Sequence, residues 1–367
     1  MRKIRVLVVD DSTVIRRLLA DSLTSDPNLE VAGTAANGKI ALAKISQVNP
    51  DVITLDMEMP EMDGITTLVE VRKLYPKLPV IMFSTLTQRG AEATLDALSK
   101  GANDYVTKPA NVGSVTAAMQ NVRNELVPKI KAFCPWFAKC QVVTQLPRPA
   151  FELKVAVQKN TAEANRIDIV AIGSSTGGPN ALQTVLSKIP ADFPVPIVVV
   201  QHMPPIFTKH LADRLNQLTS LNVTEAKRGD ALVPGGVWIA PGDYHMTLRR
   251  DGAVVRVDLS QGTPENSCRP AVDVLFRSVN ELFGRNVLSV VLTGMGQDGA
   301  RGCEAIRSTG GKVIAQDEET SVVWGMPGAV AQAGLADKIL PLDRIADEIV
   351  RETAQARKTR ILEKVGT

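Results

Sequence analysis

Carboxylates gather at the ends of two apolar runs in the first third of the chain. Asp10 and Asp11 follow the β-rich run at residues 3–9, and Asp56 follows a second run at 51–55. If these runs are parallel neighbours in a sheet, the three carboxylates meet at one edge. There they repel one another unless a hard divalent cation joins them, and Mg²⁺ suits such oxygen ligands. The spacing therefore predicts a magnesium site.

The same edge is expected to receive a hydroxyl and a lysine. Ser84 ends a run at 79–83, and Lys108 follows a run at 103–107. Together with magnesium, these groups could accept and orient a phosphoryl group, with one carboxylate as the nucleophile. The alternative is that strand-end Asp residues only cap the helices that follow. Five such elements at successive strand ends favour the phosphoryl site.

A second region has the pattern of a serine nucleophile. Residues 173–177 read Gly-Ser-Ser-Thr-Gly after a strongly apolar run, which fits G-x-S-x-G with Ser175 at its centre. This pattern is typical of a tight strand-to-helix turn that exposes the serine. The rival is a phosphate-binding loop, but no Gly-Lys-Ser/Thr follows and the glycine spacing is not G-x-G-x-x-G.

A serine nucleophile needs a base and a carboxylate that orients it. Of the three histidines, His202 directly follows a buried run, whereas His210 is expected on the surface of a predicted helix and His245 within a turn-rich insertion. Asp298 also follows an apolar run. Three strand ends would thus bring Ser, His and Asp to one edge, in an order that differs from that of α/β-hydrolases.

Two successive alternations of strand and helix position these residues. In the first, strands are expected at 3–9, 29–34, 51–55, 79–83 and 103–107, with helices at 12–23, 38–47, 64–74, 90–99 and 112–126. The second begins at Ile167, and its stretch 223–257 has the turn signals of a small antiparallel insertion. The expected fold class is α/β, with two doubly wound parallel-sheet domains, the first five-stranded and flavodoxin-like.

Composition excludes several classes of protein. The 367 residues are 44% hydrophobic and 22% charged, as in an ordinary soluble protein, with a net charge of +3. The basic excess lies in residues 126–166, so neither large block has the clustered positive charge of a nucleic-acid-binding domain. No segment approaches the ~18 consecutive apolar residues of a membrane span, and the apolar run near the N-terminus, residues 6–9, is shorter than a signal peptide's run of about 7–15. A cytoplasmic protein without membrane insertion is expected.

Four motifs of the first alternation carry a resemblance. VVDDS at 8–12, DVITLDMEMPEMDG at 51–64, MFST at 82–85 and GANDYVTKP at 101–109 resemble a response-regulator receiver domain. The resemblance implies that Asp56 is the phosphoacceptor. It implies a Mg²⁺ site formed by Asp10, Asp11, Asp56 and the backbone carbonyl of Glu58. It also implies that Ser84, Tyr105 and Lys108 couple phosphorylation to a change in conformation, in which the Ser84 side chain moves toward the phosphoryl group.

The second alternation resembles the catalytic domain of chemotaxis protein-glutamate methylesterases of the CheB type. The resemblance is carried by IGSSTGGP (172–179), QHMPP (201–205), IAPGDYHM (239–246), RPAVDVLF (269–276), LTGMGQDG (292–299) and AQDEETSVVWGMPGAV (315–330). It implies a catalytic triad of Ser175, His202 and Asp298. The same resemblance implies that Thr176 and Met295 lie beside the active site and that the Met295 N–H would be an oxyanion donor.

These resemblances imply a function and a division of the chain. The substrate would be a glutamate γ-methyl ester on methyl-accepting chemoreceptors, with methanol released. Receptor glutamines would be deamidated by the same chemistry, without a cofactor for the esterase reaction. A chemotaxis histidine kinase would be the phosphodonor, and phosphorylation would activate the enzyme. The expected units are the receiver 1–127, a basic linker 128–165, the methylesterase domain 166–355 and a tail 356–367.

Two other classes of protein stay open at this point. One is a DNA-binding response regulator, which the size and charge of the second domain disfavour. The other is a receiver fused to a catalytically dead scaffold, which the complete Ser, His and Asp set disfavours.

Overall fold

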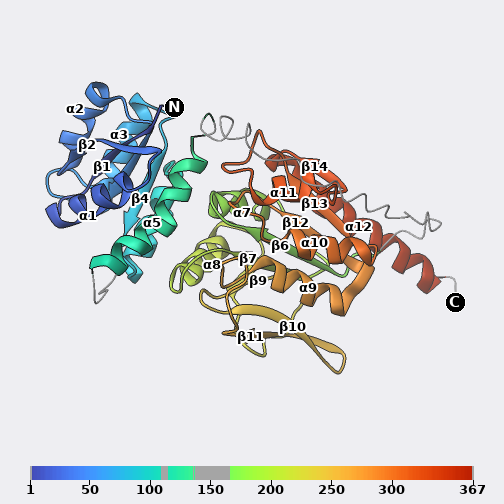
Figure 1. Ribbon diagram of the computed structural model, residues 1–367. Helices are drawn as coiled ribbons and strands as arrows, with labels where there is room; N and C mark the ends of the chain where they lie inside the picture. Colours follow the sequence, from blue (N-terminus) through green and yellow to red (C-terminus); the bar gives the residue numbers. More distant parts are fainter. Residues whose placement is uncertain (1, 109–114, 135, 137–165, 366–367) are drawn as a thin grey trace, which may run out of the picture.

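The chain folds into two α/β units that lie side by side (Figure 1). The computed structural model describes residues 2–108, 115–134, 136 and 166–365. None of the helices within these ranges is long and apolar enough to cross a membrane.

The first unit is a five-stranded parallel sheet in the order β2-β1-β3-β4-β5. Its strands are β1 (Ile4–Val9), β2 (Leu29–Ala35), β3 (Val52–Asp56), β4 (Val80–Ser84) and β5 (Asp104–Thr107). Its helices are α1 (Thr13–Thr24), α2 (Gly38–Val48), α3 (Gly64–Leu74), α4 (Gln88–Ser99) and α5 (Val115–Ala132). The central strand β3 is buried along its whole length, as a parallel sheet covered on both faces requires. Because β1 and β3 are neighbours, their carboxyl ends meet at one edge.

Helix α5 differs from the sequence expectation. It continues through Pro128 to Ala132, whereas a linker was expected from residue 128. Ile130 and Cys134 are buried in the core of the first unit, and Lys131 forms an ion pair with Asp26 at 2.7 Å. A proline inside a helix costs about 3 kcal/mol, and the burial of these apolar side chains on the sheet offsets that cost. The rest of the expected linker, 135 and 137–165, lies outside the described residues.

The second unit has a seven-stranded parallel sheet in the order β14-β13-β12-β6-β7-β9-β8. Its strands are β6 (Ile169–Ser174), β7 (Ile197–Gln201), β8 (Asn222–Glu225), β9 (Gly236–Ile239), β12 (Val287–Val291), β13 (Lys312–Gln316) and β14 (Lys338–Leu340). Its α-helices are α7 (Gly178–Leu186), α8 (Phe207–Leu218), α9 (Val272–Phe283), α10 (Ala300–Ser308), α11 (Met326–Gln332) and α12 (Leu342–Val365). Strand β6 is central, with β12 on one side and β7 on the other. The predicted class of two parallel-sheet α/β domains is confirmed.

Two details of the second unit differ from expectation. The antiparallel pair is confined to β10 (His245–Asp251) and β11 (Val254–Ser260), whereas β8 and β9 extend the main sheet as parallel strands. Turn signals mark where a chain reverses, but they do not determine which strand it joins. Helix α12 also runs to Val365, through most of the expected tail.

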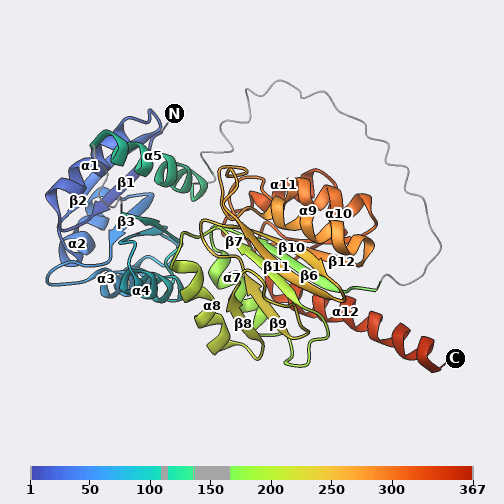
Figure 2. The same cartoon turned by 90° about the horizontal axis from the view of Figure 1, so that it is seen from below.

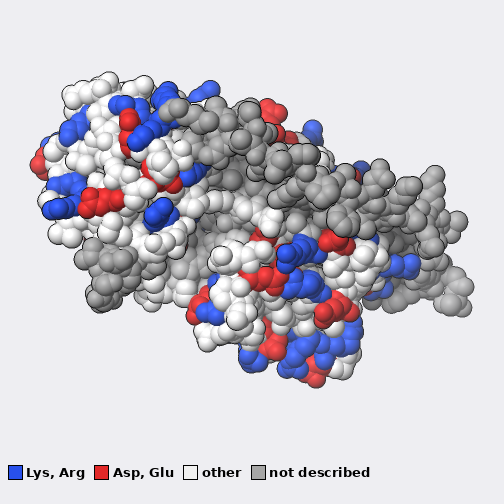
Figure 3. Space-filling view, in the orientation of Figure 1, with Lys and Arg blue, Asp and Glu red and all other residues white. Residues whose placement is uncertain are grey.

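The two units meet along α4, which packs against α7 and α8 (Figure 2). At this contact the ring of Tyr105 stacks on Phe207, with centroids 4.9 Å apart and planes 5° from parallel. On the face shown in Figure 3, basic and acidic side chains are interspersed over both units. In the hairpin, for example, Arg256 pairs with Asp251 at 2.8 Å.

Candidate phosphorylation site and candidate active site

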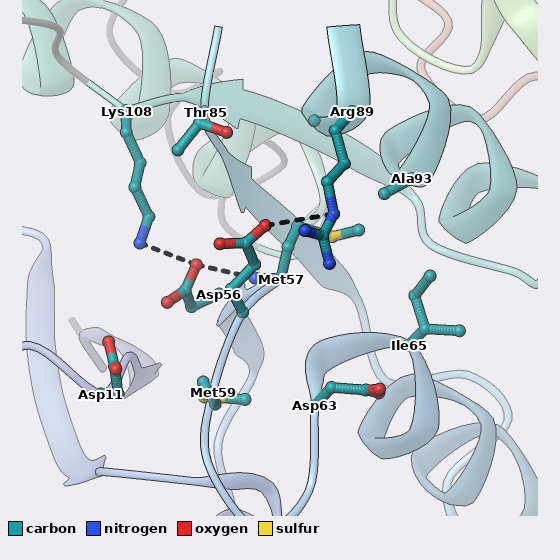
Figure 4. A pocket seen from close by; sticks show the side chains of 12 residues that line it. Asp11, Asp56, Met57, Met59, Asp63, Ile65, Thr85, Arg89, Ala93 and Lys108 are labelled. Atoms are coloured by element: carbon teal, nitrogen blue, oxygen red, sulfur yellow. Dashed lines mark hydrogen bonds and ion pairs between the residues drawn. The ribbon is translucent and has the colours of Figure 1, made fainter. Parts of the chain in front are cut away.

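The acidic edge of the first unit brings together the carboxylates expected there. Asp10 and Asp11 follow β1 and Asp56 ends β3, and their ligand atoms lie within 4.8 Å of one another. Lys108 reaches the cluster from the end of β5: its Nζ lies 2.7 Å from Asp56 Oδ1 and 3.0 Å from Asp10 Oδ2. Figure 4 shows Lys108 on one side of Asp56 and Arg89, from α4, on the other.

The electrostatics of this edge suit a cation. Asp56 is only 2% exposed, and burial, together with the charge of Asp10, raises its pKa to about 6 against the opposing effect of Lys108. Burial alone would lower the pKa of Lys108, but its ion pairs with Asp56 and Asp10 raise it. Asp56 Oδ2 is buried and accepts no hydrogen bond from the residues that the structure describes. A cluster of two buried carboxylates and an exposed one, with an unpartnered oxygen on Asp56, fits a hard divalent ion.

A cavity of about 540 Å³ opens beside Asp56. Glu58 and Thr85 are among its lining residues, and the side chain of Glu58 lies 3.8 Å from Arg89. The Ser84 hydroxyl instead donates to the Gly90 carbonyl at 3.1 Å. Ser84 therefore faces the start of α4 in this structure, and it must rotate to approach a group on Asp56.

The second unit places Ser175, His202 and Asp298 after three adjacent strands. Ser174 at the end of β6 pairs with Gln201 at the end of β7, so Ser175 and His202 leave the sheet side by side. The His202 N–H donates to the Ser174 carbonyl at 3.1 Å. Asp298 lies in the loop after β12, the other neighbour of β6.

His202 and Asp298 form a buried pair. His202 Nε2 lies 2.8 Å from Asp298 Oδ2. The carboxylate also accepts backbone hydrogen bonds from Val272 at 2.7 Å, Asp273 at 3.0 Å and Gly299 at 3.0 Å. Burial acts to raise the pKa of Asp298, but the hydrogen bonds from His202 and the backbone lower it overall. Asp298 is therefore an ionised acceptor for the imidazole.

The other ring nitrogen of His202 faces a thiol. Burial acts to lower the pKa of His202, but the ionised Asp298 raises it above its usual value. With Nε2–H donating to Asp298, the neutral ring keeps Nδ1 as its acceptor. Nδ1 lies 3.6 Å from Cys268 Sγ, and no hydrogen bond joins it to Ser175 within the described residues.

The turn around Ser175 is tight and closely packed. Gly177 has a φ of +77°, which side-chain-bearing residues rarely adopt, and it precedes α7. Gly294, from the loop that also carries Met295, approaches Ser175 so closely that a Cβ at 294 would lie 2.9 Å from the Ser175 Cβ. This approach brings the backbone of the 293–298 loop to the nucleophile candidate.

Thr176, next to Ser175, contacts the first unit. Its Oγ1 donates to Asp104 Oδ2 at 2.8 Å, and Lys129 Nζ lies 2.9 Å from the same oxygen. Tyr105, stacked on Phe207, is the neighbour of Asp104. The two expected site residues Thr176 and Tyr105 therefore lie at the contact between the units.

One expected position is wrong. His210 was expected on a helix surface, but it lies at the contact between the units, with its side chain 19% exposed. Its Nδ1 lies 3.6 Å from a carboxylate oxygen of Glu92 on α4. The sequence shows the helix but not the neighbour that covers it.

Three residues near the sites have no signal of their own in the sequence. One turn supplies two of them: Asn266 contacts Asp298, and Cys268 contacts His202. The third is Asp104, which contacts Thr176. Asp104 lies within the receiver-like motif at 101–109 and Cys268 directly before the esterase-like motif at 269–276. Their proximity to these motifs is the only signal that could have indicated them.

Comparisons with known proteins identify both units. Residues 170–349 match the family described as CheB methylesterase, and residues 6–120 match the response regulator receiver domain. A protein-glutamate methylesterase/protein-glutamine glutaminase of Trichodesmium erythraeum is 55% identical, over 96% of this chain and 99% of its own length. The chain belongs to the CheB methylesterase family.

Further relatives agree with this assignment. A protein of the same name from a Nocardioides species is 52% identical, over 97% of each chain. The match to the crystal structure of the Thermotoga maritima CheB methylesterase catalytic domain has 45% sequence identity and a TM-score of 0.50. It covers 50% of this chain and 98% of the Thermotoga chain. The family and the hydrolase class expected from the sequence are confirmed, while the roles of individual site residues stay predictions.

Proposed function

We propose that this enzyme hydrolyses glutamate γ-methyl esters on methyl-accepting chemoreceptors in the cytoplasm, releasing methanol, and deamidates receptor glutamines. Its role would be adaptation in chemotaxis. Both activities appear in the names of its relatives. The observation that carries the proposal is the buried His202–Asp298 pair, at 2.8 Å, on the strand end beside Ser175.

In the proposed reaction, the Ser175 hydroxyl attacks the ester carbonyl and His202 Nδ1 takes its proton. The tetrahedral intermediate collapses to an acyl-enzyme as its bond to the methoxy oxygen breaks, and that oxygen takes the same proton and leaves as methanol. Water, deprotonated by His202, then attacks the acyl-enzyme; the bond to Ser175 Oγ breaks, Oγ takes the proton back from His202, and free glutamate is released. Asp298 keeps the imidazole oriented and stabilises its charged form. For a glutamine substrate, ammonia leaves in place of methanol.

The oxyanion would be stabilised by backbone N–H groups. Gly294 lies against Ser175, and the N–H of the next residue, Met295, is proposed to donate to the carbonyl oxygen of the bound ester. That N–H has no acceptor among the described residues. A preorganised donor of this kind typically contributes about 3–4 kcal/mol to transition-state stabilisation.

The receiver, which we extend from residue 127 to Cys134, would regulate the esterase. We propose that an Asp56 oxygen attacks the phosphorus of a phosphohistidine on the chemotaxis kinase and breaks its P–N bond. Asp10, Asp11, Asp56 and the Glu58 carbonyl would hold Mg²⁺. When bound, the ion supplies charge that offsets the carboxylates and the phosphoryl group. Lys108 would orient the phosphorylated side chain.

The unphosphorylated receiver is proposed to restrain the esterase. Its Asp104 accepts a hydrogen bond from Thr176, the residue after Ser175, and α4 covers α7 and α8. Phosphorylation would turn Ser84 from Gly90 toward the phosphoryl group and shift the start of α4. This change would favour an open arrangement of the two units and so activate the enzyme.

Replacing Ser175 with Ala tests the catalytic part of the proposal. Methanol release from methylated receptor should fall by roughly 10³-fold or more, while folding and Asp56 phosphorylation stay intact. Ser174→Ala is the matched control, because it removes a neighbouring hydroxyl that bonds Gln201 at 2.7 Å. That variant should stay within tenfold of wild type. Residual Ser175→Ala activity within tenfold of wild type would refute the nucleophile assignment.

A further inference from the structure

A tight turn at residues 265–268 lies against the proposed catalytic pair. Glu265 and Cys268 exchange two backbone hydrogen bonds, of 3.1 and 2.9 Å, and the two residues between them have φ angles of +52° and +62°. This is the pattern of a type I′ turn, in which Asn is favoured. Arg277 on α9 bonds both carboxylate oxygens of Glu265, at 2.8 and 2.6 Å. The turn is therefore anchored to the body of the domain.

The turn presents one side chain to each member of the pair. Asn266 Nδ2 donates to Asp298 Oδ1 at 2.8 Å, and Cys268 Sγ lies 3.6 Å from His202 Nδ1. His202 Nε2 binds the other carboxylate oxygen of Asp298. The Asn266 amide and the His202 imidazole thus add to the three backbone N–H groups that already bond this carboxylate, and its rotation is restricted.

The same amide also bonds a second buried carboxylate. Asp273 is 1% exposed, and its Oδ2 accepts from Asn266 Nδ2 at 2.9 Å. Burial, together with the charge of Asp298, raises the pKa of Asp273. A donor placed between two carboxylates reduces their repulsion. Asn266 therefore lets Asp298 stay charged beside His202 in a buried site.

We propose that Asn266 is a positioning residue of the esterase, which holds Asp298 so that His202 directs Nδ1 toward Ser175. This inference rests on the proposed function. Asn266 itself does not touch the reacting atoms. Its loss should lower kcat and leave KM unchanged, because the groups that bind substrate are not altered. Outer partners of this kind typically change activity by about 10- to 100-fold.

Two variants separate the amide from the turn. Asn266→Gly deletes the amide and keeps the backbone, because glycine adopts positive φ without strain. Asn266→Asp keeps the shape but adds a carboxylate beside Asp298 and Asp273. Ser267→Asn is the matched control, since it places the same amide one position later. The Ser267 side chain makes no hydrogen bond to any residue in the described ranges.

The experiment measures methanol release by the full chain over a range of pH, with an acyl phosphate as phosphodonor and methylated receptor as substrate. Asn266→Gly should lower kcat about 10- to 100-fold with KM within about twofold of wild type. Asn266→Asp should move the acid limb of kcat/KM to higher pH, because the added negative charge stabilises protonated His202. The other charged or titratable groups around the pair are Cys268, Glu265, Asp273, Arg277 and Arg301.

The outcomes distinguish this inference from the proposed function. An inactive wild type, or an active Ser175→Ala variant, would mean that the proposed function fails. If wild type is active and Ser175→Ala is inactive, the proposed function stands. The positioning role would then be overturned if both Asn266 variants had the same kcat and the same pH profile as wild type. The positioning role would also be overturned if the Asn266 variants and Ser267→Asn lowered kcat equally and Asn266→Asp left the acid limb unmoved. A general disturbance of the turn would then explain the loss of activity.

Discussion

Replacing Asp104 with Ala should activate the enzyme without phosphorylation. Asp104 is buried at the contact between the units, where its Oδ2 accepts from Thr176 Oγ1 at 2.8 Å. Alanine removes this acceptor. In the closed arrangement, in which the two units are in contact, the Thr176 hydroxyl then lacks a hydrogen-bond partner, whereas in the open arrangement water can bond it. The closed arrangement therefore loses stability relative to the open one.

The size of the effect follows from the type of bond. A hydrogen bond to a charged group contributes about 1.5–3 kcal/mol, so the ratio of open to closed molecules should rise about 10- to 150-fold. The receiver itself should stay folded, since Lys129 keeps its 2.7 Å hydrogen bond to the Tyr105 carbonyl. The basal rate should rise by the same factor until it reaches the rate of the phosphorylated enzyme.

The assay is methanol release from methylated receptor without a phosphodonor. Glu92→Ala is the control, because Glu92 also faces the catalytic unit, but its pair with His210 spans 3.6 Å and its side chain is 69% exposed. Exposed pairs contribute about 0–1 kcal/mol, so that variant should change the basal rate by less than about fivefold. A basal rate of Asp104→Ala equal to wild type, with phosphorylation still activating, would refute the restraint through Thr176.

Two further predictions concern the catalytic edge. Asp298 raises the pKa of His202, and only the neutral imidazole can act as a base, so kcat/KM should rise with pH through that pKa. Asp298→Asn should move this rise to lower pH and reduce kcat by several orders of magnitude. Alkylation with iodoacetamide should inactivate wild type but not Cys268→Ser, because Cys268 Sγ lies 3.6 Å from His202 Nδ1. Among the other cysteines that the structure describes, Cys134 and Cys303 are buried with raised pKa values, so they should react slowly. Equal inactivation of both proteins would count against this reasoning.

The sheets of both units could be predicted because their central strands are buried on both faces. Such strands are mainly apolar runs; Asp56 ends β3, and Ser175 follows the end of β6. Helix α5 could not be delimited, because Pro128 normally ends a helix and only the packing of Ile130 shows that this helix continues. Turn signals mark chain reversals, but they contain no information that β9 would pair in parallel with β7 and with β8.

Some residues of the candidate sites could likewise be predicted from the sequence, and others could not. Ser175, His202 and Asp298 could be proposed from strand ends alone, since parallel neighbours bring their carboxyl ends to one edge. Asn266 and Asp104 could not, because each contacts its partner from a separate element, a turn before α9 and a strand of the other unit. Contacts of this kind depend on how the elements pack, and residue type at one position does not predict them.

The course of α5 determines where the chain can be cut into separate fragments. A receiver fragment that stops at residue 127 lacks Ile130 and Cys134, which are buried, and the ion pair of Lys131 with Asp26. Loss of one buried isoleucine side chain typically costs about 2–5 kcal/mol, a large part of the stability of a small domain. Such a fragment would expose the apolar surface of α1 and tend to aggregate. A fragment that ends at Cys134 keeps this surface covered.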